Sequence, residues 1–337
     1  MFDSEFALPW VVRDVSLGWG ATRGPDEEVR DPDARWFGGI CACVNDGSVR
    51  CIGTGRRAVA SVEERSVGEC ASVAGGPYGG CATSVAGRVR CWGEPLDAPG
   101  VDALRDIVQV EVSREHACAR DTRGGVFCWG IDWLGETSGP RSTSLPESRR
   151  VRRVPDVTAR SISVGALRSC ALVEGGISCW GWDPGESCFV SIGSTSVATA
   201  DPACRHDRPI LRLGGDFVAV ESGNANTCGL TVTGVVRCNG VPYIGPTPPG
   251  YKTFYTGWGS LAQHAIGKNV ALLAMGENSM CVLSTSGLVS CWGPINGAPL
   301  VALGHFPGSQ VRTIHAPDGE PCLPITAPVP DHFWVEL

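Results

Sequence analysis

The chain contains very little lysine, with only Lys252 and Lys268 among 337 residues, and its net charge is −7. A surface that binds nucleic-acid phosphates is instead rich in basic side chains. The one basic cluster consists of arginines, at residues 149–150 and 152–153, and such a short run is typical of a solvated loop. We therefore expect no nucleic-acid partner.

Long apolar segments are also missing. No part of the sequence reaches the roughly 18 consecutive apolar residues of a membrane-spanning helix, so we expect no membrane span. Residues 1–5 are acidic and are not followed by the apolar core of an export signal. Long stretches of helical periodicity are absent too, whereas short valine-rich runs such as residues 108–112 alternate with period two and predict strands.

The motifs of common catalytic and cofactor sites do not occur. We find no Gly-x-Ser-x-Gly turn, no phosphate-binding glycine loop followed by Lys-Ser or Lys-Thr, and no His-Glu-x-x-His. Structural zinc needs close cysteine pairs with a second pair or histidines, and Cys41-Ala42-Cys43 is the only tight pair. We expect no catalytic residue, no metal and no cofactor.

Cysteine, by contrast, is abundant, with 17 residues. Six times a cysteine is followed by a glycine-closed turn and a second cysteine, which usually precedes Trp-Gly. The pairs are Cys41 with Cys51, Cys81 with Cys91, Cys118 with Cys128, Cys170 with Cys179, Cys228 with Cys238, and Cys281 with Cys291. Internal repeats of this length are typical of propellers and solenoids.

The spacing within each pair predicts an antiparallel hairpin. Between Cys41 and Cys51 the loop is Asn45-Asp46-Gly47, and glycine suits the left-handed third position of such a loop. The equivalent glycines are Gly87, Gly124, Gly234 and Gly287, while the Cys170 repeat has a two-residue turn, Glu174-Gly175. In both variants the cysteines form a non-hydrogen-bonded pair with Cα atoms roughly 4.5 Å apart. We therefore predict six cross-strand disulfides; buried free thiols are the alternative, and zinc ligands are favoured less than either.

Five cysteines lie outside this series. Cys188 and Cys204 can close a loop of 17 residues, and Cys43 can bridge to Cys70, which leaves Cys322 free. So many disulfides predict an oxidising, extracytoplasmic location: secreted, periplasmic or at the cell surface. Since no export signal is visible, it lies upstream of this start or the protein takes another route.

The repeat unit resembles the regulator of chromosome condensation repeat family, in its bacterial form with cysteines in the hairpin. The resemblance covers roughly residues 34–337 and is carried by Cys-Ala-Leu-like strands, glycine turns and Cys-Trp-Gly. The best matches are Cys170-Ala171-Leu172 with Cys179-Trp180-Gly181, His116-Ala117-Cys118 with Cys128-Trp129-Gly130, and Cys281 with Cys291-Trp292-Gly293, and residues 131–136 look like the family's post-tryptophan loop. Ile52 and Asn239 replace the tryptophan in two repeats. We expect structural roles for Trp92, Trp129, Trp180, Trp292 and His116.

The resemblance implies an all-β, seven-bladed β-propeller of four-stranded antiparallel blades in a single domain, 1–337. Residues 34–310 hold the six clear repeats, and residues 311–337 hold a degenerate seventh with Cys322 at the first cysteine position and His332 at the second. Residues 1–33 form an N-terminal segment whose residues 11–17 can supply a ring-closing strand for that last repeat. Six blades plus a cap are the alternative.

One segment points to binding. Tyr243, Tyr251, Phe254, Tyr255 and Trp258 lie within 16 residues, interleaved with four prolines. Tyrosine and tryptophan give large contact area at low entropy cost, and proline stiffens a loop. The alternative role for these rings is to cover the edge of the fifth blade.

The function predicted is therefore a secreted or surface-exposed, non-enzymatic scaffold that binds an unknown protein partner through rim loops, and a monomer is favoured. A hydrolase or lyase with an axial site is one alternative, and it requires carboxylates that converge at the centre of the ring. A protein inhibitor similar to β-lactamase-inhibitory protein type II is another. The acidic charge and the cysteines argue against the family's eukaryotic role as a Ran exchange factor on chromatin.

Overall fold

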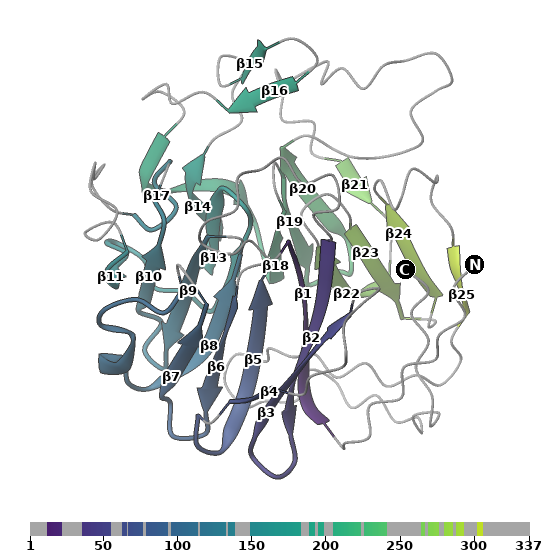
Figure 1. Cartoon of the computed structure of the whole chain (residues 1–337). Helices are drawn as coiled ribbons and strands as arrows, with labels where there is room; N and C mark the ends of the chain where they lie inside the picture. Colours follow the sequence, from purple (N-terminus) through teal and green to yellow (C-terminus); the bar gives the residue numbers. More distant parts are fainter. Residues whose placement is uncertain are drawn as a thin grey trace.

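The computed structural model is built of antiparallel β-sheets (Figure 1). The predicted all-β class is confirmed, and η1 (Val101–Ala103), a short 3-10 turn, is the one helical element of the described part. No helix there is long and apolar enough to cross a membrane. The structure describes residues 12–21, 36–54, 63–65, 67–76, 79–93, 96–113, 115–132, 134–138, 149–182, 189–192, 195–198, 205–223, 226–240, 264–266, 269–275, 280–285, 288–292 and 302–305.

Five four-stranded sheets and one three-stranded sheet follow one another along the described chain, and each contains one cysteine hairpin. An opening strand precedes each hairpin, and in the four-stranded sheets a further strand lies outermost. The strands of the first three sheets are β1 (Val12–Ala21), β2 (Trp36–Val44), β3 (Val49–Thr54) and β4 (Glu63–Arg65); β5 (Cys70–Gly76), β6 (Gly79–Ser84) and β7 (Val89–Trp92); and β8 (Ile107–Val112), β9 (His116–Asp121), β10 (Val126–Gly130) and β11 (Arg152–Arg153). Those of the next three are β12 (Ser161–Val164), β13 (Arg168–Val173), β14 (Gly176–Trp182) and β17 (Arg205–Gly214); β18 (Phe217–Ser222), β19 (Asn226–Thr231), β20 (Val236–Gly240) and β21 (His264–Ile266); and β22 (Val270–Met275), β23 (Met280–Ser284), β24 (Leu288–Trp292) and β25 (Ala302–His305).

The sheets are arranged as the blades of a propeller. Each opening strand contacts the opening strand of the next sheet, from β1 through β5, β8, β12 and β18 to β22 (Figure 1). Sequential blades are therefore spatial neighbours. Residues 311–337, where the sequence predicts the seventh repeat, lie outside the described residues, and the blade count stays a prediction.

The hairpins have the predicted register. The residues flanking the loops are hydrogen-bonded, as in Val44 N to Ser48 O at 2.9 Å, and the cysteines lie opposite each other. The turn glycines Gly47, Gly87, Gly124 and Gly234 have φ of +87°, +68°, +80° and +74°. Gly287 lies outside the described residues. In the shortened hairpin, Val173 pairs with Gly176 around Glu174-Gly175.

Five of the six hairpin pairs are disulfide-bonded in the structure, with Cα–Cα distances of 4.0 to 4.1 Å. Each cysteine is bonded to the partner that the spacing predicts. The bonds join Cys41 with Cys51, Cys81 with Cys91, Cys118 with Cys128, Cys170 with Cys179, and Cys228 with Cys238.

The remaining five cysteines of the sequence analysis and the sixth hairpin pair have different outcomes. Cys43 and Cys70 form a disulfide that joins the first and second blades. The backbones of Cys281 and Cys291 pair as predicted, but their sulfurs lie outside the described part of the chain, so that bond stays a prediction. The structure describes no part of the other three, Cys188, Cys204 and Cys322.

Three features differ from the expected layout. β1 pairs with β2 and so opens the first blade, where the sequence analysis assigned this segment to the last blade and began the repeats at residue 34. Among the described residues the second blade has three strands rather than four, and the described chain after β7 forms turns and η1. The long insertion of the fourth blade contains its own hairpin, β15 (Phe189–Ile192) with β16 (Thr195–Ala198).

The core lies between blades, and the hairpin disulfides are part of it. The disulfide of the third blade packs against Trp180 and Ile162 of the fourth, and that of the fourth packs against Phe217 of the fifth. In the fifth blade, Cys228 and Cys238 are buried against Val270 of the sixth. The first blade differs, because both Cys41 and Cys51 are only half-buried there.

The tryptophans of the repeat pack into the same junctions. Trp129 and Trp180 are buried, and Trp92 packs against the core between the first two blades. Their expected structural role therefore holds. The side chain of Trp292 lies outside the described residues.

Polar side chains also join neighbouring opening strands. The Asp14 carboxylate accepts from Val73 N at 2.8 Å, and the Ser163 hydroxyl accepts from Ser222 N at 2.8 Å. The Gln109 side chain forms two such hydrogen bonds with one residue: its oxygen accepts from Ile162 N at 3.1 Å, and its nitrogen donates to Ile162 O at 2.8 Å. A buried backbone group left without its partner is costly, so these side chains hold adjacent blades in register.

We expect Gln109→Ala to lower the free energy of unfolding by about 2–4 kcal/mol, because both polar groups of Ile162 lose a buried partner. The adjacent Val108→Ala is the matched control: Val108 is 45% exposed, and its truncation should change stability by less than about 0.5 kcal/mol. Urea unfolding of both variants measures the difference. If both variants lost the same free energy of unfolding, the two hydrogen bonds from Gln109 to Ile162 would add no stability to the junction between the blades.

Candidate functional site

The predicted binding residues Tyr243, Tyr251, Phe254, Tyr255 and Trp258 lie outside the described residues. Their role as a binding surface therefore stays a prediction. The described part offers two polar assemblies on which function can be judged. One is a loop network at the junction of the third and fourth blades, and the other is a pair of glutamates on the opening strands.

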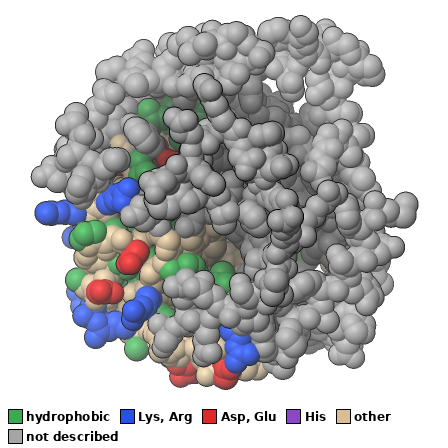
Figure 2. Space-filling view, in the orientation of Figure 1, with side chains coloured by type: hydrophobic (Ala, Val, Ile, Leu, Met, Phe, Trp, Pro, Cys, Tyr) green, Lys and Arg blue, Asp and Glu red, His purple; other side chains and the backbone are tan. Residues whose placement is uncertain are grey.

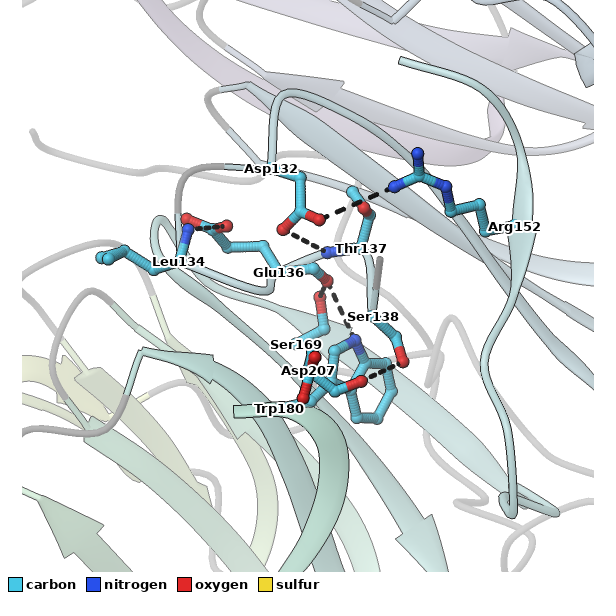
Figure 3. Close-up of polar contacts among 9 residues, drawn as sticks. All are labelled: Asp132, Leu134, Glu136, Thr137, Ser138, Arg152, Ser169, Trp180 and Asp207. Atoms are coloured by element: carbon cyan, nitrogen blue, oxygen red, sulfur yellow. Dashed lines mark hydrogen bonds and ion pairs between the residues drawn. The ribbon is translucent and has the colours of Figure 1, made fainter. Parts of the chain in front are cut away.

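The loop network is built on residues 131–138, which follow the Trp129-Gly130 step of the third blade (Figure 3). The Glu136 carbonyl accepts from Ser169 Oγ and from Trp180 Nε1, both at 2.9 Å, and both donors belong to the fourth blade. Ser138 Oγ donates to Asp207 O of β17 at 2.6 Å. The loop thus fastens the third blade to the fourth.

Two carboxyl groups are buried within this loop. Asp132 lies 3.8 Å from the Arg152 guanidinium and accepts from Thr137 N at 3.4 Å. Glu136 is 1% exposed, and its carboxylate accepts from Leu134 N at 2.6 Å. Burial raises the pKa of Glu136 well above the ordinary value of 4.5, and the charge of Asp132 raises it further. The arrangement suits a protonated Glu136 beside Asp132.

The raised pKa of Glu136 predicts a loss of stability as the pH rises. The unfolded chain releases this proton near pH 4.5, whereas the folded protein holds it to higher pH, so the free energy of unfolding falls between the two values. Glu136→Gln mimics the protonated acid and should remove this part of the pH dependence while it keeps the acceptor for Leu134 N. Urea midpoints for both proteins between pH 5 and 8 test this, at about 1.4 kcal/mol per pH unit for one proton. Parallel pH profiles would contradict it.

His116 lies in a buried hydrogen-bond chain that could be mistaken for a catalytic serine–histidine pair. Ser169 Oγ donates its only proton to Glu136 O, so His116 Nε2–H donates to Ser169 Oγ at 3.0 Å. The other ring nitrogen, Nδ1, lies 2.9 Å from Ser113 Oγ, which is also within 3.2 Å of His116 O. Burial lowers the pKa of His116 to about 3, so the ring is neutral at physiological pH. The histidine is a structural link between blades, as the sequence analysis expected.

The same joint recurs one blade further on. Arg168 occupies the position of His116, two residues before the first cysteine, and its Nη1 donates to Thr227 Oγ1 of the fifth blade at 3.2 Å. Thr227 in turn occupies the position of Ser169. Each hydroxyl also contacts the preceding disulfide, at 3.4 Å from Cys118 Sγ and at 3.3 Å from Cys170 Sγ. The repeat therefore includes a polar joint as well as a disulfide.

The second assembly consists of Glu111 on β8 and Glu221 on β18. Each lies opposite the first cysteine of its hairpin, at equivalent positions of two opening strands. Burial raises the pKa of Glu221 well above its ordinary value, the negative charge of Glu111 adds to the rise, and a hydrogen bond from Ser163 opposes it. Two carboxyl groups therefore act on each other across the opening strands.

The sequence analysis assigned no role to Asp132, Glu136, Ser113, Ser169, Glu111 or Glu221. It did single out residues 131–136 as a post-tryptophan loop. Asp132 and Glu136, four residues apart in this loop, were the sequence signal that could have indicated the buried carboxyl groups. Glu111 and Glu221 both lie seven residues before a hairpin cysteine, so aligning the repeats by cysteine would have placed them together.

These features define a β-propeller with disulfide-braced hairpins. Its solved structural neighbours include human WBSCR16, with a TM-score of 0.61, 14% identity, and coverage of 85% of this chain and 77% of that one. Prp20p from Saccharomyces cerevisiae aligns with a TM-score of 0.58 at 15% identity over 84% of this chain and 82% of its own. Yeast RCC1 (Prp20), in its complex with Kap60, gives 0.57 at 15% identity over 78% and 71%.

The likeness is one of fold, because the sequence identity to each neighbour is low. No family model matches the sequence, and the search of characterised proteins gives no match. The comparisons therefore show the β-propeller fold that this chain shares with RCC1-like structures.

Proposed function

We propose that this protein is a protein-interaction scaffold of an oxidising compartment, secreted or held at a cell surface, and a cysteine-containing form of the RCC1-type repeat. The observation that carries the proposal is the bracing of the blades by disulfides across their hairpins. Such bonds persist outside the cytosol. A rigid ring also presents its loops at low entropy cost to a partner.

Two further observations support binding over catalysis. In the loop network, His116 and the backbone carbonyl of Glu136 link the third blade to the fourth, while the carboxyl groups of Asp132 and Glu136 are buried within the third blade. The yeast neighbour Prp20 has been solved with Kap60 bound, and Prp20p has been studied for its binding to Gsp1p and histones. Propellers of this fold thus serve as platforms for protein partners.

The proposed binding surface is the aromatic segment with Tyr251, Tyr255 and Trp258. A pull-down from the native extracytoplasmic fraction should retain its specific partner with the wild type and lose it with all three residues changed to alanine. The matched control is Val85→Ala with Val232→Ala, which truncates side chains that are 62% and 64% exposed on two hairpin turns. A partner retained by the triple variant would exclude this surface.

One observation favours a second candidate, an axial hydrolase or lyase acting on polysaccharide. Glu111 and Glu221 occupy equivalent positions of two opening strands, and the raised pKa of Glu221, to which the charge of Glu111 contributes, suits a general acid. Incubation with soluble polysaccharides, followed by a reducing-end assay, tests this candidate. Activity that Glu221→Gln abolishes, in a variant that folds normally, would replace the scaffold with an enzyme.

A further inference from the structure

Within the described residues, the second blade has no outermost strand of the kind that the other blades have. In those blades β4, β11, β17, β21 or β25 pairs with the second hairpin strand, whereas β7 has no such neighbour. The chain turns away directly after β7: Leu96 N and Asp97 N both donate to Gly93 O, at 2.9 and 3.1 Å. It then continues into η1. The fourth-strand position of this blade is therefore not filled by a strand of the described chain.

The backbone of β7 is oriented to accept such a strand. The disulfide-bonded pair Cys81–Cys91, with Cα atoms 4.0 Å apart, is a non-hydrogen-bonded pair of the ladder. The N–H and C=O groups of Cys91, and those of Val89 two residues earlier, consequently point away from β6. These are the groups with which a fourth strand forms its hydrogen bonds.

A groove of about 310 Å³ runs along this edge. Its lining includes Val67 and Gly68, from the connection between the first two blades, and Asp102 of η1. Arg88, Val89 and Arg90 line it as well. Arginine side chains (blue) mark this lower-left part of the molecule in Figure 2, where Figure 1 has β7.

The side chains at the groove select the charge of its occupant. Arg88, directly before β7, and Arg90, within it, are both exposed, and they project from the same face because residues two apart in an extended chain share a face. In an added strand, the residues opposite them lie about 5 Å away, where carboxylates are favoured and lysines are repelled. Asp102 lines the groove from η1 and disfavours acidic residues beside it.

We infer that the edge of β7 is a docking site for an extended, acidic segment of a partner protein, which adds to the second blade as its fourth strand. Main-chain hydrogen bonds to Val89 and Cys91 supply the affinity, and carboxylates at alternate positions supply the specificity. This surface includes none of the aromatic residues in 243–258. A negative result at one surface therefore leaves the proposal for the other surface unchanged.

The test uses the full oxidised protein and a blocked synthetic peptide of about eight residues that alternates glutamate with threonine. We expect saturable binding, and slower hydrogen exchange at the amides of Val89 and Cys91 when the peptide is bound. A peptide N-methylated at the residues that face β7 should not bind, because it cannot form the ladder. Amides of Val89 and Cys91 that are already protected in the free protein would overturn the inference, since the edge would then be occupied.

Charge reversal tests the specificity. Arg88→Glu with Arg90→Glu should weaken binding of the acidic peptide by at least about tenfold and allow the lysine–threonine version to bind instead. Arg123→Glu, on the exposed turn of the third blade, is the control for net charge and should leave binding unchanged. The rescue by the lysine peptide shows that the double variant is folded. Equal weakening by both charge changes, or no binding of the wild type, would refute the site.

Discussion

Reduction of the disulfides is expected to unfold the protein. Each hairpin bond closes a loop of 9 or 10 residues in sequence separation, and Cys43–Cys70 closes one of 27. On the chain-entropy model each hairpin bond contributes about 2–3 kcal/mol, and the longer loop contributes about 3.5 kcal/mol. The described bonds together therefore stabilise by an amount comparable to the whole stability of a typical domain, about 5–15 kcal/mol. Circular dichroism in urea, with and without a phosphine reductant, should show a transition that shifts far toward zero denaturant.

A single bond can be tested without reductant. Replacing Cys118 and Cys128 together by alanine should lower the free energy of unfolding by about 2–3 kcal/mol. Alanine is chosen because both positions are fully buried and a serine hydroxyl there would lack a partner.

Thiols of the folded protein that react with an alkylating agent before any reduction would contradict the bonded state, and with it the case for an extracytoplasmic location. The half-buried pair of Cys41 and Cys51 is the most sensitive place to look for such a reaction.

The hairpins were predictable because their information is local. A cysteine, a glycine turn and a second cysteine fix the pairing within about ten residues, and turn length sets the register. The register of the opening strands, by contrast, could not be predicted from such local information. In the third and fifth blades, an extra residue near the start of the opening strand shifts the register, and the bulged Val108 and Val218 are 45% and 47% exposed. A valine in a period-two run gives no sign of such a bulge.

The three-stranded form of the second blade in the described chain also left a trace in the sequence. Pro95, Pro99 and Gly100 follow the Trp92-Gly93 step, and proline is disfavoured in paired strands. The repeat-based expectation of four strands per blade overrode this local signal. A strand was expected over residues 11–17, and the structure has it over Val12–Ala21. It pairs with β2 rather than with the last repeat, because pairing between distant segments depends on tertiary contacts.

The polar joints between blades could not be predicted from single repeats. The contacts from His116 to Ser169 and from Arg168 to Thr227 span 53 and 59 residues, so both partners become visible only when repeats are superimposed. Arginine and histidine at one repeat position also look unrelated by residue type. Both donate to a hydroxyl on the next blade, and the shared chemistry explains why the position tolerates either residue.

The second large effect is expected at Trp180, the side chain on which the joint between the third and fourth blades depends. It is 1% exposed and packs against Cys118, Cys128 and Ile162, while its indole Nε1 donates to Glu136 O. Trp180→Ala should lower the free energy of unfolding by about 3–5 kcal/mol through lost burial and a cavity.

Trp180→Phe separates packing from the hydrogen bond. It retains most of the apolar contact but leaves the Glu136 carbonyl with Ser169 as its remaining donor, so a loss of about 1–2 kcal/mol is expected. Trp92→Ala is the comparison, because Trp92 occupies the equivalent repeat position but is only partly buried. If Trp92→Ala cost as much as Trp180→Ala in urea unfolding, the loop network would contribute nothing specific at this junction. A larger loss at Trp180 means that the post-tryptophan loop, as well as the disulfides, holds adjacent blades together.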